Sequence, residues 1–341
     1  MRKPDLAYYV SRFFESYLSG QKNVSENTVI SYATTMTQLN AFFEDVKSIK
    51  TKRLRLEDMD AETFLNWLEK ERGVSVATRN QRLVAIRSFF EYVMKHAPVH
   101  MERARRILNI PYKKAPRTLV AYLTEDEMRA LLAQPSGNDK TGFRDRVILS
   151  VLYDTGARVQ EFVDIRMKDV RLEKPAVITL HGKGNKIRSV PVMRASVKLL
   201  EAYLDSSKRN PGIDRGENPL FANRNGEALS RWGVSHIISK YVKQAQSEGK
   251  LHVDFPVTPH TFRHSKAMHM LHAGLNLFYI RDFLGHVDVA TTEIYARADT
   301  EMKRKAIEAS CENLLPSDDL PDWNKDKGVM EFLESLRRPR K

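Results

Sequence analysis

The segment TPHTFRHSKAMHML, residues 258–271, carries two histidines four positions apart, His260 and His264. On a helix this spacing puts both imidazoles on one face, as in the H-E-x-x-H motif of zinc proteases. HTFRH differs from that motif, because Arg263 would repel a divalent metal and no carboxylate lies within it to serve as ligand or base. The residues therefore disfavour a metal site and leave open either a buried structural pair or a site for an anion.

The surroundings of HTFRH favour the anion site. Thr258 is a suitable N-cap and Pro259 a suitable first helical residue, so the motif lies at a helix N-terminus with its free N–H groups. Five of the ten histidines gather here, at positions 260, 264, 269, 272 and 286. Gly285 is a natural helix end, His286 follows it directly, and Tyr295 comes nine residues later. The segment predicts a positively charged pocket with one tyrosine nucleophile.

The composition favours a polyanion as partner. The 341-residue chain has a formal net charge of +13, and nucleic acid is the usual partner of such a chain, although a merely basic protein is the plain alternative. No apolar run approaches the roughly 18 residues that span a bilayer, and Arg12 and Glu15 interrupt the N-terminal apolar stretch, against a signal peptide. Cys311 is the only cysteine, which fits a reducing, cytoplasmic setting without a membrane.

Residues 4–96 are predicted to be helical. Ser25, Asp60 and Ser75 are candidate N-caps of successive helices. The last helix has an apolar side at helical spacing and a basic side that we interpret as DNA-binding. Its basic residues are Arg79, Arg82 and Arg87. A solvated charged face is the commoner interpretation of such a pattern.

Residues 98–118 read as a basic linker between two domains. Prolines at 98, 111 and 116 punctuate it, and one short helix is expected near 100–108. Lys113, Lys114 and Arg117 are candidate DNA contacts in this linker.

A second helical unit begins at Thr124, which has the spacing of a capping box with Glu127. Residues 176–192 then read as two strands joined by a glycine-bearing turn at 182–185, and residues 219–229 as a shorter hairpin. Helices return from about residue 230. Residues 315–325 read as a spacer before a short amphipathic helix, GVMEFLESL, and a basic end.

Five ordered motifs resemble the tyrosine recombinase (phage integrase) family: TGARVQE, GKGNK, HTFR, LGH and TTEIY. The resemblance covers nearly the whole chain. It implies a mainly α fold with a small antiparallel β component, in which a helical core-binding (SAM-like) domain and a mixed α/β catalytic domain close round DNA as a clamp. The domains would span 1–97 (core-binding), 98–118 (linker), 119–312 (catalytic) and 313–341 (C-terminal extension).

Carried over residue by residue, the resemblance implies a complete catalytic set. The roles would be Tyr295 as nucleophile, Arg158 and Arg263 as clamps on the scissile phosphate, Lys183 as general acid, His260 as general base or proton relay, His286 as a hydrogen-bonding partner of the phosphate, and Glu161 as a supporting partner of the pocket. No metal or other cofactor is implied.

The chemistry of phosphoryl transfer explains these residue types. Negative charge grows on the nonbridging phosphate oxygens, and arginines offer forked, permanently charged donors for them. Tyrosine has a pKa of about 10, so it needs a base and a cationic pocket to react near neutral pH. The leaving 5′-oxygen needs a proton, which a lysine can supply. A phosphotyrosyl linkage keeps the bond energy, so strands can be rejoined without ATP or metal.

The sequence therefore predicts a site-specific recombinase or integrase of a mobile element, acting through a Holliday junction as a homotetramer on two sites in double-stranded DNA. A resolvase or chromosome-dimer recombinase, and a type IB topoisomerase that relaxes supercoils, remain alternatives. A catalytically silent DNA-binding regulator and a metal-dependent nuclease are further rivals. The C-terminal helix is expected to dock on a neighbouring protomer, with a frayed basic terminus as the alternative.

Overall fold

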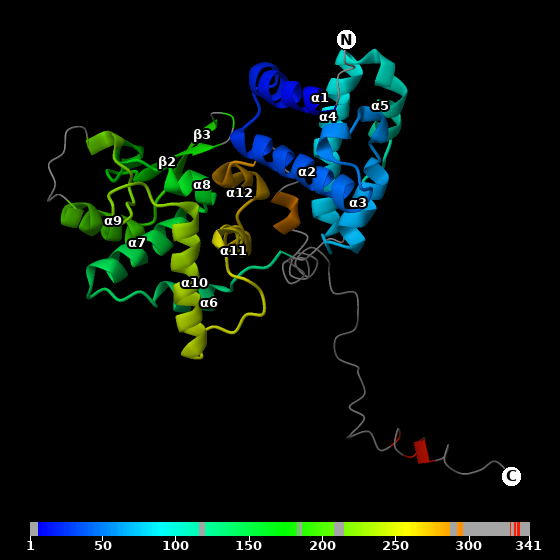
Figure 1. Ribbon diagram of the computed structural model, residues 1–341. Coiled ribbons are helices and arrows are strands. Elements are labelled where there is room, and N and C mark those ends of the chain that lie inside the picture. Colours follow the sequence, from blue (N-terminus) through cyan, green and yellow to red (C-terminus); the bar gives the residue numbers. More distant parts are fainter. Residues whose placement is uncertain are drawn as a thin grey trace. The chain divides into compact units, whose positions relative to one another are not determined.

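The computed structural model describes residues 6–115, 120–182, 184, 186–207, 215–286 and 292–295, and isolated positions 328, 331, 333 and 334. The chain separates into two compact units, Met1–Thr118 and Leu119–Lys341. In the described residues of both units helices predominate, and a small antiparallel sheet lies in the second unit (Figure 1). The predicted mainly α fold with a small β component is confirmed. Most of the C-terminal extension lies outside the described residues. The prediction that its helix docks on a neighbouring protomer falls on this part of the chain.

The N-terminal unit is built from α-helices with short turns of other helix types between them (Figure 1). Its α-helices are α1 (Leu6–Arg12), α2 (Glu26–Asp45), α3 (Ala61–Lys70), α4 (Val76–His96) and α5 (Met101–Leu108). A π-helical turn, Phe13–Gln21, continues α1, and 3-10 turns cover Thr51–Arg53, Leu56–Asp58 and Pro98–His100.

Local sequence signals set the starts of these helices. Ser25, Asp60 and Ser75 are the N-caps of α2, α3 and α4, as predicted, and the last two accept a backbone N–H with their side chains. Aromatic side chains then fill the core between the helices, including Phe13, Phe42, Phe64, Phe89 and Phe90, each at most 1% exposed. Burial of each such ring stabilises the unit by about 1.5–3 kcal/mol.

The predicted linker packs against the N-terminal unit over its described part. Helix α5 buries Ala104 and Ile107 in the same core. The extended segment after it is held by side chains of α4. Arg87 donates to the carbonyl oxygens of Leu108 and Ile110, and its guanidinium lies over the ring of Tyr112 at 4.5 Å.

Arg79, interpreted from the sequence as a DNA-binding residue on the basic side of α4, is buried. Its side chain is 4% exposed, and Nη1 donates to the carbonyl oxygen of Pro111 at 3.0 Å. Neighbouring Asn80 donates to the carbonyl of Lys113 at 2.7 Å. Arg79 and Arg87 therefore fasten the chain after α5 to α4. Helical periodicity could not show this, because the residues that accept from these arginines lie 21 to 32 positions later in the chain.

The second unit carries its helices around one main apolar core. They are α6 (Glu125–Leu132), α7 (Lys140–Thr155), α8 (Val159–Val163), α9 (Arg194–Ser207), α10 (Arg231–Ser247), α11 (Pro259–His272) and α12 (Leu277–Leu284). Thr124 and Glu127 form the predicted capping box of α6. Within the described ranges, no helix is long and apolar enough to cross a membrane.

The sheet has strand order β1-β2-β3, with both neighbouring pairs antiparallel. The strands are β1 (Val170–Arg171), β2 (Val177–Gly182) and β3 (Lys186–Pro191). Gly182 pairs with Lys186, so the predicted turn is confirmed, and Gly184 takes a left-handed φ of 74° within it. Ile178, Leu180 and Val190 face the core. The sequence did not predict β1, which is too short to leave an alternating pattern.

Two left-handed glycines bring separate helix ends to one place. Gly156, with φ 54°, ends α7, and Arg158 is the N-cap of α8 two residues later. Gly285, with φ 67°, ends α12, and His286 follows. Helix α11 packs against both α7 and α12 (Figure 1). Side chains from the start of α8, from α11 and from the end of α12 can therefore meet.

The buried contacts of Arg79 predict a structural role. Arg79→Ala should lower the free energy of unfolding by about 1–3 kcal/mol, because it removes the hydrogen bond between a buried guanidinium and the carbonyl of Pro111. Urea denaturation followed by tryptophan fluorescence measures this. Lys114→Ala, at an exposed residue, is the control and should change stability by less than about 0.5 kcal/mol. Equal stability of both variants would contradict the structural role of Arg79.

Candidate active site

Arg158 stands at the N-terminus of α8 with its carboxylate partner one turn away. Its Nη1 donates to Glu161 Oε1 at 2.8 Å, and its backbone N–H donates to Oε2 at 2.9 Å. The Arg158 side chain is 42% exposed, whereas that of Glu161 is 4% exposed. The buried carboxylate thus orients a guanidinium that still reaches solvent and can meet an anionic ligand.

Arg188, on β3, is a second partner of the same carboxylate. Its Nη2 donates to Glu161 Oε2 at 2.7 Å, and its Nε donates to the carbonyl oxygen of Phe283 at 3.0 Å. Burial alone would raise the pKa of Glu161, but the hydrogen bonds from Arg188 and Arg158 outweigh it and lower this pKa to about 2. Glu161 is therefore ionised at neutral pH. The sequence analysis did not identify Arg188 as a site residue. The only feature of the sequence that could have indicated it is its position shortly after the glycine turn.

Arg263, on α11, lies deepest in the site. Only 3% of it is exposed, and its Nη atoms donate to the carbonyl oxygens of Gly156 and Leu284, both at 2.6 Å. Burial, together with the charges of Arg158 and Arg188, lowers the pKa of Arg263 to about 9. The guanidinium is still charged at neutral pH, and it joins the ends of α7 and α12 directly.

His286 follows α12 and lies among the same charges. Its Nδ1 is 2.9 Å from the hydroxyl of Thr292. Burial and the nearby cations, of which Arg263 contributes most, lower the pKa of His286 to about 4. Its imidazole is therefore neutral at pH 7. The ring lies nearly parallel to that of Tyr295, with centroids 6.4 Å apart.

Tyr295 is buried beside these groups, in the helical segment 292–295. It is 1% exposed and packs against apolar side chains of α11 and α12. Its hydroxyl is 2.9 Å from Nδ1 of His264. Burial raises the pKa of Tyr295, and the charges of Arg263 and Arg158 offset this only in part. In this position the phenol is neutral.

The two histidines of HTFRH have different surroundings. His264 is half-buried against Tyr295, and burial, followed by the charges of His260 and Arg263, lowers its pKa to about 4. His260 is exposed, with its ring centroid 6.4 Å from that of His264. Across the described ranges no three His, Cys, Asp or Glu side chains gather in a way that could hold a metal ion. The sequence analysis gave His264 no role, because spacing alone does not show which imidazole meets the tyrosine.

The structure brings together Arg158, Glu161, Arg263, His286 and Tyr295 from the predicted set, with Arg188 and His264 added. Lys183, which comes between β2 and β3 in the sequence, lies outside the described residues. Three guanidinium groups with a single carboxylate between them leave an excess of positive charge. Such a pocket suits an anion with several oxygens, and a phosphodiester fits this description.

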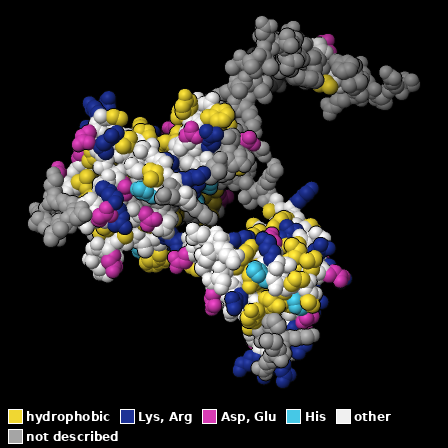
Figure 2. Space-filling model, turned by 90° about the horizontal axis from the view of Figure 1, so that it is seen from above, with side chains coloured by type: hydrophobic (Ala, Val, Ile, Leu, Met, Phe, Trp, Pro, Cys, Tyr) yellow, Lys and Arg dark blue, Asp and Glu magenta, His cyan; other side chains and the backbone are white. Residues whose placement is uncertain are grey.

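The other predicted DNA contacts lie in the N-terminal unit. Lys114 is exposed, Lys113 pairs with Glu69 at 2.6 Å, and Arg82 is partly buried. Arg117 lies outside the described residues. Lys and Arg side chains appear on both parts of the chain, interspersed with acidic ones (Figure 2). The face seen in Figure 2 therefore shows no single basic patch that alone would locate DNA.

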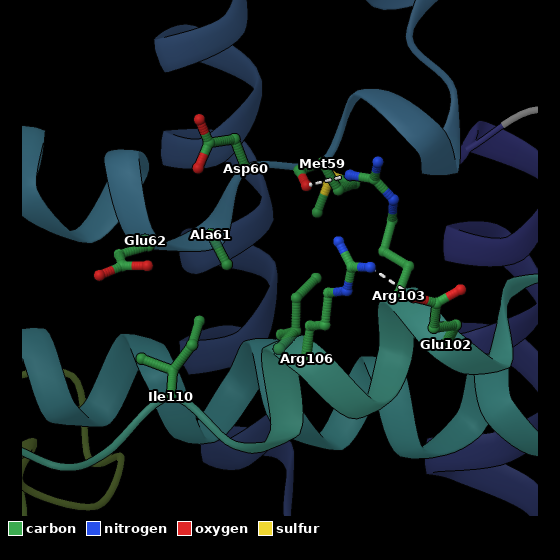
Figure 3. A pocket seen from close by; sticks show the side chains of 9 residues that line it. Met59, Asp60, Ala61, Glu62, Glu102, Arg103, Arg106 and Ile110 are labelled. Atoms are coloured by element: carbon green, nitrogen blue, oxygen red, sulfur yellow. Dashed lines mark hydrogen bonds and ion pairs between the residues drawn. The ribbon is translucent and has the colours of Figure 1, made fainter.

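A pocket of about 290 Å³ lies in the N-terminal unit, between the start of α3 and helix α5 (Figure 3). Arg103 donates to the carbonyl of Met59, and Arg106 pairs with Glu102 (Figure 3). Asp60 and Glu62 line the same space. The arginines are engaged within the pocket and carboxylates face the cavity, so this pocket suits an anion less well than the site around Arg263.

Family models match both units of the chain. A model of the phage integrase family matches residues 121–302, and a model of the phage integrase N-terminal SAM-like domain matches residues 11–97. The integrase/recombinase-like protein y4rC of Sinorhizobium fredii is 35% identical over 334 residues, covering 97% of this chain and 98% of that protein. Tyrosine recombinase XerD of Halalkalibacterium halodurans is 31% identical over 277 residues, covering 81% of this chain and 88% of its own.

Solved structures share the fold. The Tn1549 transposon integrase in complex with transposon right end DNA has a TM-score of 0.67 at 19% identity, over 88% of this chain and 99% of that one. The XerH site-specific recombinase bound to palindromic difH substrate has a TM-score of 0.64 at 22% identity, over 84% and 80% of the two chains.

The environment of His264 predicts a pH dependence of stability. Its pKa is about 4 in the folded chain and about 6.5 when unfolded, so the unfolded chain binds more protons between these values. Stability should therefore fall as the pH drops from about 6.5 to about 4. His264→Asn keeps a polar group near the position of Nδ1 but cannot titrate, so this variant should lose less stability between pH 7 and pH 5. Urea denaturation at both pH values measures the difference, and equal losses in the two proteins would refute the assignment.

Proposed function

Because this chain belongs to the phage integrase family, whose tyrosine recombinases break and rejoin DNA strands, we propose that it is a site-specific DNA recombinase with Tyr295 as nucleophile. One observation carries the proposal: the only tyrosine among the described site residues contacts an imidazole beside the buried guanidinium of Arg263. Both nucleophile and cations are thus present for attack on a phosphodiester.

The proposed cleavage step exchanges one phosphoester for another. The hydroxyl oxygen of Tyr295 attacks phosphorus and its proton passes to an imidazole, with His260 in the role of base or relay. The bond from phosphorus to the 5′-oxygen breaks, and Lys183 gives that oxygen a proton. A 3′-phosphotyrosyl linkage and a free 5′-hydroxyl result. Attack of a 5′-hydroxyl from another strand reverses the step and seals the new junction, without metal or ATP.

The positive charge of the site supports this chemistry. Arg158 and Arg263 would donate to the nonbridging oxygens, where charge grows in the transition state, and His286 would add a neutral hydrogen bond. Each preorganised donor of this kind contributes about 10²–10³ in rate. Glu161 holds Arg158 while remaining ionised, so it limits repulsion among the guanidinium groups.

Cleavage requires Tyr295 to move. With 1% of the residue exposed, its hydroxyl cannot reach a phosphate on a DNA duplex in the observed position. To present the hydroxyl to a phosphate, the hydrogen bond to His264 would have to break and the segment 292–295 would have to move. The described structure thus corresponds to a resting arrangement of the nucleophile.

The biological role follows the relatives. We propose integration or excision of a mobile element, by a homotetramer that joins two double-stranded DNA sites through a Holliday junction. Support comes from the similarity to the Sinorhizobium fredii protein over nearly the full length of both chains. The similarity to XerC and XerD proteins equally suits a resolvase or chromosome-dimer recombinase. Recombination between DNA sites on separate molecules would indicate an integrase, whereas recombination only between two sites on one circle would indicate a resolvase. Relaxation of supercoils without site preference would instead indicate topoisomerase-like activity.

The nucleophile is tested by Tyr295→Phe. This variant should bind DNA with unchanged affinity but form no covalent adduct, because it lacks the attacking oxygen. The measurement uses a nicked suicide substrate and a denaturing gel. Tyr279→Phe, at an exposed tyrosine of α12, is the matched control and should still form the adduct. An adduct in the Tyr295 variant would eliminate Tyr295 as the nucleophile.

Substitutions in the candidate active site should slow DNA cleavage, whereas substitutions at DNA-contacting lysines should weaken DNA binding. Arg158→Ala should slow cleavage by about 10²–10³-fold, because it removes one preorganised donor to the phosphate.

Lys114→Ala should instead weaken DNA binding and reduce the slope of log affinity against log salt by about one unit, if it contacts a phosphate. Filter binding across salt concentrations measures the slope. An unchanged slope would show that Lys114 makes no such contact.

A further inference from the structure

Arg188 joins three parts of the site that carry proposed catalytic residues. It lies on β3, the strand that follows the turn with Lys183. Its Nη2 reaches the carboxylate of Glu161, which in turn holds Arg158. Its Nε reaches the carbonyl of Phe283, in the last turn of α12 before His286. No role for this residue follows from the motifs in the sequence.

We propose that Arg188 is a positioning residue for strand cleavage, which aligns Arg158 through Glu161 and His286 through the end of α12. The inference rests on the proposed function. Arg188 acts through these neighbours, because only 14% of its side chain is exposed and both its Nε and Nη2 donate to protein atoms.

The space around the guanidinium shows how tightly it is held. A Cβ on Gly285 would lie 2.9 Å from Nη1 of Arg188 and 3.2 Å from its Cζ. Gly285 also has a φ of 67°, which favours glycine. The backbone turn that leads to His286 therefore passes directly against Arg188. The position of His286 and that of the guanidinium are coupled by contact.

Lysine cannot replace these contacts together. The guanidinium offers donors in a fixed fork, and here the two donors meet a carboxylate and a carbonyl on different elements. An ammonium group can still pair with Glu161, so that the buried carboxylate keeps a counter-ion. Its single nitrogen cannot occupy the positions of both Nε and Nη2, so the contact with the end of α12 should weaken. Arg188→Lys should therefore preserve folding while loosening the alignment of the site.

The test compares single-turnover cleavage of a nicked suicide substrate at saturating protein, so that binding does not limit the rate. Arg188→Lys should cleave about 10–100-fold more slowly than wild type, since misplacement by about 1 Å can cost 10²-fold. Its DNA affinity and melting temperature should stay close to those of wild type. Arg129→Lys is the control: this exposed arginine of α6 pairs with Asp126 and should leave the cleavage rate unchanged.

A double-mutant cycle tests whether Arg188 acts through Glu161. Arg188→Met, Glu161→Gln and their combination are measured in the same assay. If the two residues act as one unit, the double variant should cleave at about the rate of the slower single variant. Rate losses that multiply, or wild-type cleavage by Arg188→Lys, would overturn the positioning role. The proposed function itself has a different test: if the wild-type protein formed no covalent adduct, the proposed function would be refuted, and the positioning role, which depends on it, would be refuted as well.

Discussion

The site depends on holding several positive charges where little water can screen them. Arg263 is 3% exposed, and Arg158 and Arg188 are near enough to depress its pKa. Like charges at short range repel strongly in such surroundings. The protein limits this repulsion with one ionised carboxylate, Glu161, and with the carbonyls of Gly156 and Leu284 as acceptors for Arg263. An excess of positive charge remains, and an anionic phosphodiester would neutralise it.

Burial, together with these charges, sets the protonation of the histidines beside them. His264 and His286 both have a pKa of about 4, so each imidazole is neutral at pH 7 and keeps a lone pair. A neutral imidazole can accept a phenolic proton, whereas a protonated one cannot. The pocket thus combines permanent cations for a phosphate with neutral imidazoles beside the tyrosine, while the exposed His260 is the proposed base or relay. On the proposed function, arginine supplies the charge and histidine remains free for proton transfer.

The sequence predicted local structure well where the signal is local. The N-caps Ser75 and Thr124, the glycine turn after β2 and the helix end at Gly285 each depend on a few adjacent residues, and all are confirmed. Contacts between distant segments were not predictable in this way. Arg79 was interpreted as a DNA-binding residue, and the sequence did not show that it is buried and donates to Pro111. Arg188 was missed because its partners lie 27 and 95 residues away. The two histidines of HTFRH share a helix face, yet only packing shows that His264 meets Tyr295.

On the proposed function, the burial of Tyr295 sets an energetic condition on cleavage. Exposing a ring of this size costs about 1.5–3 kcal/mol, and losing its hydrogen bond to His264 costs about 1 kcal/mol more. These terms together correspond to an exposed nucleophile in roughly one molecule in a hundred to one in a thousand, since each 1.4 kcal/mol is a factor of ten. Contacts with several phosphates can readily supply this free energy. If the exposed position is favoured only when DNA fills the cationic pocket, the tyrosine is presented where a phosphodiester is already held, and it stays neutral and covered elsewhere.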